Sequence, residues 1–187
     1  MIEQAKLFAI AAHEAVGQRR RYTNEPYYVH TQEVATLVQI FRGTDTMIAA
    51  AHLHDVVEDT KIPLDVIQDL FGDRVGDLVH WLTDKSKLED GNRKVRKAID
   101  RNHLAQAPAE AQLIKCCDVI SNTRTIVMHD PIFAVTYLEE INLLLDVLVK
   151  TNPIVLLTAR RSVASAEKLL TTKELCSAES LQEKSVH

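Results

Sequence analysis

The stretch of residues 52–60 constrains the fold more than any other part of the chain, because it gathers acidic and imidazole side chains at the end of a strongly apolar run. The flanking sequence predicts burial, and ionisable groups buried close together are costly unless a cation compensates them. On a helix, Asp55 shares a face with both Glu58 and Asp59, three and four residues later. A fold that accommodates this stretch must therefore supply a partner for these charges, and a metal ion is the simplest one.

The spacing within this stretch suggests different roles for its members. His54 and Asp55 diverge by about 100° on a helix, so they can bind one ion only if the helix end points obliquely at it. With these two as candidate ligands, Glu58 and Asp59 would lie over the open side of the ion. General acid and base catalysis needs carboxyl groups there, so we expect both to be catalytic. We do not assign His52 as a ligand.

Apolar residues recur with helical periodicity along the chain, and no alternating strand pattern of useful length occurs. We therefore expect an all-α fold with one domain over residues 1–170 and a polar tail over residues 171–187. The expected helices cover residues 2–18, 28–41, 45–60, 63–71, 74–83, 93–105, 108–129, 132–150 and 153–170, with Thr44 or Asp45 as the cap of the third.

Composition excludes several classes of function. The 187 residues are 46% hydrophobic and 26% charged, which is ordinary for one globular domain. No run is long enough to span a membrane and no signal peptide is evident, so we expect a cytoplasmic protein without a membrane partner. Cys116, Cys117 and Cys176 lack disulfide or zinc-ribbon spacing and are expected to be reduced. A net charge of -4 argues against a nucleic-acid-binding surface, despite the arginines at residues 19–21.

Two further elements could complete a site. The helix expected over residues 108–129 carries a polar stripe at intervals of three and four residues, flanked by apolar residues and cysteines. The stripe consists of Lys115, Asp118, Asn122 and Thr125. His30 is an isolated candidate on the second expected helix, and taken alone it would be a hydrogen-bonded core residue.

His30, the His54-Asp55 pair and Asp118 resemble, in this order, the H…HD…D signature of HD-domain metal-dependent phosphohydrolases. The chain also resembles the hydrolase domain of the RelA/SpoT alarmone enzymes over about residues 5–130. Four stretches carry this resemblance: residues 21–30, 50–60, 71–75 and 115–122. The resemblance implies an HD-domain helical bundle with a central metal site. By the same resemblance, one divalent ion, usually Mn²⁺, would be bound by His30, His54, Asp55 and Asp118. Mixed imidazole and carboxylate ligation by itself suits Mn²⁺, Fe²⁺ or Zn²⁺.

The activity implied by the resemblance is hydrolysis of the 3′-pyrophosphate of guanosine 3′,5′-bis(diphosphate), ppGpp or pppGpp, to GDP or GTP and pyrophosphate. A stand-alone small alarmone hydrolase would do this by metal-assisted attack of water. By the same resemblance Arg21 stacks on the base, while Asn122 and Thr125 contact the nucleotide. Lys115 is a further candidate for substrate binding, or it pairs with a carboxylate. Tyr22 stands where the family commonly has lysine, which leaves guanine or adenine preference open.

Two other classes of function stay open. Another HD phosphohydrolase could act on a deoxynucleotide monophosphate or on the 2′-phosphate of a dinucleotide, and it would release phosphate rather than pyrophosphate. A non-catalytic nucleotide sensor would use the metal structurally, but it would have no need of Glu58 and Asp59 as acid/base groups. The sequence leaves the oligomeric state unknown.

Overall fold

The computed structural model describes the backbone of residues 1–184 and the side chains of residues 1–173. These residues confirm the expected all-α class, since the β-pairing among them is one isolated bridge between Arg19 and Pro26. The helices are α1 (Ile2–Ala15), α2 (Tyr28–Ile40), α3 (Asp45–Leu53), α4 (Val56–Asp59), α5 (Leu64–Phe71), α6 (Asp73–Leu82), the 3₁₀ turn η1 (Leu88–Asp90), α7 (Arg93–Gln106), α8 (Ala109–His129), α9 (Pro131–Leu145) and α10 (Pro153–Lys184).

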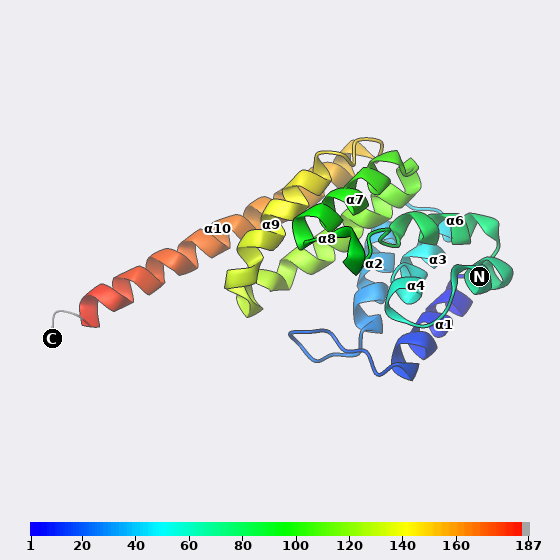
Figure 1. The fold of residues 1–187 in the computed structure, drawn as a ribbon, viewed down its shortest axis with the longest axis horizontal. Coiled ribbons are helices and arrows are strands. Elements are labelled where there is room, and N and C mark those ends of the chain that lie inside the picture. The colour runs from blue at the N-terminus through cyan, green and yellow to red at the C-terminus, as the bar shows by residue number, and fades with distance from the viewer. Residues whose placement is uncertain (185–187) are drawn as a thin grey trace.

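Helix α8 forms the centre of the bundle. It contacts α2, α3, α6, α9 and α10, so segments from both halves of the chain pack around it (Figure 1). Its inward residues, among them Ile114, Cys116 and Cys117, are fully buried. A polar group on α8 is therefore withdrawn from water wherever it faces the other helices.

Local signals explain several helix boundaries. The Thr44 side chain accepts a hydrogen bond from the Met47 amide at 3.3 Å, which confirms the expected cap of α3. Asp130 ends α8 and caps α9 by accepting from the Phe133 amide at 3.0 Å. Pro131 occupies the first turn of α9, where its missing amide hydrogen is tolerated.

The expected continuous helix over residues 45–60 is wrong in one respect. Helix α3 ends at Leu53 and α4 begins at Val56, so the chain turns at His54 and Asp55. Asp55 has φ -100° and ψ -4°, outside the regular helical range. The break provides the oblique helix end that two adjacent ligands need, because it directs both side chains toward the same point.

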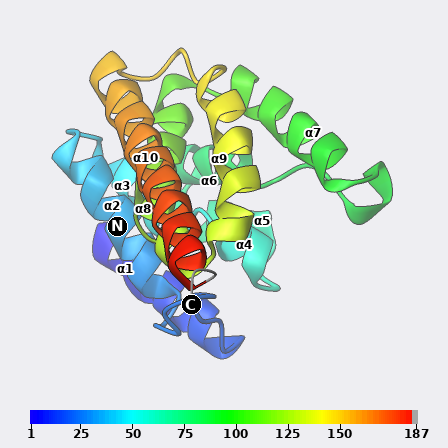
Figure 2. The same ribbon diagram turned by 90° about the vertical axis from the view of Figure 1, so that its left-hand side faces the viewer.

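Two helices, α10 and α7, reach the periphery of the bundle. Helix α10, which we expected to end near residue 170, continues to Lys184 and extends past the other helices (Figure 1). In the view of Figure 2, α7 stands at the edge of the bundle. The side chain of Cys176 lies outside the described residues. No helix among the described residues combines the length and apolar character of a membrane span.

Candidate metal centre and pocket

Four side chains from three parts of the fold meet at the break between α3 and α4. The His54 Nε2 atom lies 3.0 Å from Asp55 Oδ2 and 4.0 Å from Asp118 Oδ1. His30, from α2, places its Nε2 atom 3.2 Å from Asp118 Oδ1 and 3.7 Å from Asp55 Oδ2. The structure thus brings together all four residues that we expected to bind metal.

The donor atoms of this group fit a metal ion. Potential ligand atoms of His30, His54 and Asp55 all lie within 4.8 Å of one another. In both histidines Nδ1 is engaged elsewhere: His54 Nδ1 lies 2.9 Å from the Ala51 carbonyl and His30 Nδ1 lies 3.0 Å from Ser121 Oγ. His54 Nε2 is buried and, although Asp55 Oδ2 lies 3.0 Å away, it makes no hydrogen bond to the described residues. An imidazole nitrogen aimed at two carboxylates is a good ligand, so this group is a candidate site for a divalent metal ion.

Neighbouring charges within the cluster shift the pKa values of its members. Burial alone would lower the pKa of His54, but the Asp55 and Asp118 carboxylates outweigh it and raise that pKa to about 9. Burial would raise the pKa of Asp55, but His54 and His30 hold it below its ordinary value. Lys115 and His30 likewise outweigh burial and hold the pKa of Asp118 well below its ordinary value. Both carboxyl groups of the cluster are therefore kept in their charged, metal-binding form.

Glu58 and Asp59 lie one turn beyond the cluster on α4, at its solvent-exposed side. Partial withdrawal from water, together with repulsion from Asp84 and Asp55, raises the pKa of Glu58 to about 7. Burial and Asp55 also raise the pKa of Asp59. A carboxyl group that titrates near neutrality can both accept and release a proton, which is what acid/base catalysis requires.

Two residues near the cluster were missed by the sequence analysis. The Tyr27 hydroxyl donates a hydrogen bond to Asp55 Oδ2 at 2.7 Å, and the Gln18 amide donates to Asp59 Oδ2 at 2.9 Å. Each contact joins residues at least 28 positions apart. No local pattern could have revealed them, because a tyrosine or glutamine at these positions is unremarkable on its own.

The polar stripe of α8 faces the site, as its spacing suggested. Lys115 Nζ lies 2.8 Å from Asp118 Oδ2, and the Asn122 amide donates to Asp118 Oδ1 at 2.6 Å. Of the two roles considered for Lys115, the structure shows the carboxylate pair. Lys115 and Asn122 also line a pocket beside Asp118, so both remain near any ligand there.

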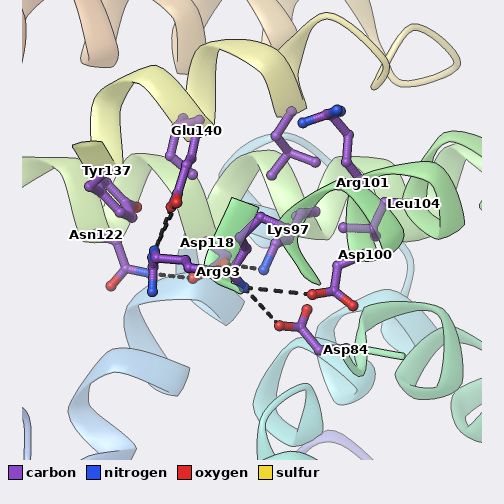
Figure 3. A pocket seen from close by; sticks show the side chains of 13 residues that line it. Asp84, Arg93, Lys97, Asp100, Arg101, Leu104, Asp118, Asn122, Tyr137 and Glu140 are labelled. Atoms are coloured by element: carbon purple, nitrogen blue, oxygen red, sulfur yellow. Dashed lines mark hydrogen bonds and ion pairs between the residues drawn. The ribbon is translucent and has the colours of Figure 1, made fainter. Parts of the chain in front are cut away.

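This pocket lies between α7, α8 and α9 (Figure 3). Its α7 wall carries the cationic residues Arg93, Lys97 and Arg101. Arg93 pairs with Glu140 at 2.8 Å, and Lys97 reaches Asp84 at 2.8 Å. The sequence predicted a basic helix over residues 93–105. Its basic composition was the available signal, but nothing local placed it beside Asp118.

A second hollow adjoins the first and contains Arg21, Asn122 and Thr125, three of the expected substrate contacts. The Arg21 guanidinium lies 5.3 Å from the centre of the Tyr22 ring and 5.9 Å from that of Phe133. Tyr22 itself donates a hydrogen bond to Asp130 at 3.1 Å. The Arg21 side chain is 73% exposed, so a planar ligand could reach its guanidinium group from solvent.

Comparison with known proteins agrees with this arrangement. The HD domain family matches residues 5–139. A protein of Synechocystis named probable guanosine-3′,5′-bis(diphosphate) 3′-pyrophosphohydrolase is 36% identical over 118 residues, which are 62% of this chain and 16% of that protein. A relative in Brucella ovis, named GTP pyrophosphokinase rsh, is likewise covered over only 17% of its length. The chain thus spans about a sixth of these longer relatives.

Smaller relatives are matched over most of their length. The guanosine-3′,5′-bis(diphosphate) 3′-pyrophosphohydrolase MESH1 of Drosophila melanogaster is 34% identical over 124 residues, 65% of this chain and 68% of that protein. A solved structure of a metazoan ortholog of SpoT that hydrolyses ppGpp superposes with a TM-score of 0.77 and 26% identity, covering 88% of this chain and 94% of the other. The chain therefore belongs to the HD domain family, in the branch that includes these pyrophosphohydrolases.

Proposed function

We propose that this protein hydrolyses the 3′-pyrophosphate of ppGpp and pppGpp, releasing pyrophosphate and leaving GDP or GTP. The observation that carries the proposal is the group of His30, His54, Asp55 and Asp118 with Glu58 at its open side. The names of the relatives supply the substrate class, because the geometry alone is compatible with several phosphate esters.

The four clustered residues are the proposed ligands of one divalent ion, with Mn²⁺ as the leading candidate and Fe²⁺ or Zn²⁺ as alternatives. When bound, such an ion would polarise a phosphoryl oxygen and acidify a water molecule. Glu58 is the proposed proton acceptor, since its pKa of about 7 suits transfer near neutral pH. Asp59, held by the Gln18 amide at 2.9 Å, would orient the attacking water.

The substrate would lie across the two adjoining hollows. Arg21 is the proposed stacking partner of the base, and Thr125 lines the same hollow. Asn122 and Lys115 border both Asp118 and the pocket of Figure 3. The guanidinium and ammonium groups of α7 would then attract the phosphates, because they face the site from the pocket's outer wall.

The proposed partner of this protein is a small nucleotide, with no role for nucleic acid. The proposed location of the enzyme is the cytoplasm. The buried free thiols of Cys116 and Cys117 are compatible with a reducing compartment.

Turnover of ppGpp by the purified protein tests the proposal. The protein is assayed with Mn²⁺ and after chelation, and nucleotides are separated by anion-exchange chromatography. GDP and pyrophosphate formed only with metal would support it. Glu58→Gln should lose turnover by about 100-fold or more while keeping its bound metal, because a general base contributes roughly that much. Loss of the metal in this variant would contradict the division of roles.

Tyr22, at the position where the family commonly has lysine, is the reason to consider a second substrate class. A tyrosine carries no positive charge for a phosphate, and here its ring stacks on His129 with centroids 5.7 Å apart while its hydroxyl donates a hydrogen bond to Asp130. An adenine alarmone, a deoxynucleotide monophosphate or a dinucleotide 2′-phosphate should therefore be assayed in parallel. Metal-dependent release of phosphate from one of the latter two, without turnover of ppGpp, would replace the proposed activity by this alternative.

A further inference from the structure

A chain of hydrogen-bonded polar groups leads from the candidate metal site, behind His30, toward the surface. The His30 Nδ1 atom lies 3.0 Å from Ser121 Oγ, and this hydroxyl donates a hydrogen bond to Glu33 Oε2 at 2.7 Å. His30 and Ser121 are only 2% and 1% exposed. Glu33 follows His30 by three residues on α2, and Ser121 follows Asp118 by three on α8. The same two helix faces therefore carry the cluster and the chain behind it.

The direction of these hydrogen bonds determines which nitrogen of His30 faces the cluster as a ligand. A serine hydroxyl has one proton, and here it points to the Glu33 carboxylate, which can only accept when it is charged. The hydroxyl must then accept from His30, so Nδ1 carries a proton. Nε2 is left as the nitrogen that can bind a metal ion.

The outer end of the chain is held by positive charge. Arg20 NH1 lies 3.5 Å from Glu33 Oε2, and Arg124 NH1 lies 3.6 Å from Glu33 Oε1. Both guanidinium groups thus lie within ion-pair distance of the carboxylate that accepts the proton of the serine hydroxyl. His54 has no such side-chain support, because its Nδ1 faces the backbone carbonyl of Ala51.

We propose that Ser121 and Glu33 are positioning residues of the metal centre: they orient His30 with Nε2 toward the cluster and thereby raise its affinity for a divalent transition-metal ion. This role concerns the metal centre and does not depend on which nucleotide the protein hydrolyses. Removing a partner of this kind behind a metal-binding histidine typically costs about 10–100-fold in metal affinity.

The test is the affinity of the full-length protein for Mn²⁺, measured from the electron paramagnetic resonance signal of the free ion. Ser121→Ala should bind Mn²⁺ about 10–100-fold more weakly than the wild type. Thr123→Val is the matched control, because it removes a buried hydroxyl from α8 that contacts the Val119 carbonyl at 2.8 Å. It should keep the wild-type affinity, and circular dichroism establishes that each variant is folded.

Glu33→Ala provides a second variant if Ser121→Ala does not fold, because the Glu33 side chain is 40% exposed and lies outside the core. A folded variant of either kind that binds Mn²⁺ within about threefold of the wild type would overturn the proposal, since the expected loss is at least about tenfold for Ser121. Wild-type protein that binds neither Mn²⁺ nor Zn²⁺ would also overturn it. No nucleotide is present, so failure of ppGpp hydrolysis would leave this measurement unaffected.

Discussion

Chelation of divalent metal should lower the thermal stability of this protein, because the proposed metal site exists only in the folded chain. His54 and Asp118 come from segments that meet only in the tertiary structure, with Nε2 and Oδ1 4.0 Å apart. A ligand that binds only the folded state at 100 times its dissociation constant stabilises it by about 2.7 kcal/mol. For a chain of this size each kcal/mol corresponds to roughly 2–4 °C, so chelation should lower the Tm by about 5–11 °C.

Two histidine variants distinguish the loss of a proposed metal ligand from the loss of any buried histidine on this part of the chain. His54→Asn removes a ligand, and a thousandfold loss of affinity would reduce the stabilisation at the same metal concentration to below about 0.1 kcal/mol. His52→Gln is the matched control. It also removes a buried histidine, 6% exposed, but His52 does not belong to the cluster. It should therefore keep the metal-dependent increase in Tm even if its metal-free Tm is lower.

Differential scanning fluorimetry with Mn²⁺, and with excess chelator, measures all three proteins. A metal-dependent shift that persists in His54→Asn would refute the assignment of the site. Equal loss of the shift in His52→Gln would show that the effect depends on the general integrity of α3 and not on a particular ligand.

Three further predictions concern the core and the network around Asp59. Leu145→Ala should destabilise the fold by about 2–5 kcal/mol in urea unfolding, because this side chain is fully buried. Leu143 is 51% exposed on the same helix, so Leu143→Ala should change the free energy of unfolding by less than about 1 kcal/mol. Equal effects of the two substitutions would contradict the packing described. Gln18→Ala removes a hydrogen bond to the Asp59 carboxylate and should lower kcat about tenfold with unchanged Mn²⁺ affinity; a change in affinity alone would be the wrong outcome. Burial lowers the pKa of His13 below 6.5, so the unfolded chain binds protons more readily and stability should fall as the pH drops below about 6.5. The fall should be smaller in His13→Gln when urea unfolding is compared across pH, and an identical pH dependence would exclude this contribution.

Much of the local structure could be predicted from the sequence because its signals are local. The helical period of apolar residues, the Thr44 cap and the break at Asp130 and Pro131 each depend on neighbours within one turn. The polar stripe of α8 was recognisable for the same reason. The extension of α10 to Lys184 was missed, because the polar composition after Leu170 gives no apolar period.

Only the tertiary structure could decide how the site is completed. The contacts from Tyr27 to Asp55 and from His30 to Ser121 join residues 28 and 91 positions apart, and sequence periodicity carries no information about such pairs. The same holds for the cationic residues of α7, which lie beside Asp118 because α7 packs against α6 and α9.

The sequence by itself determined that the chain is helical and that His54 and Asp55 stand at the end of an apolar run, because both follow from the order of residue types within a few helical turns. The tertiary structure decided which other ionisable groups meet them. It turned the chain at His54 and Asp55, brought the Tyr27 hydroxyl to Asp55 and placed Ser121 and Glu33 behind His30. These outcomes depend on how separate helices pack, and that free energy is shared among many distant contacts.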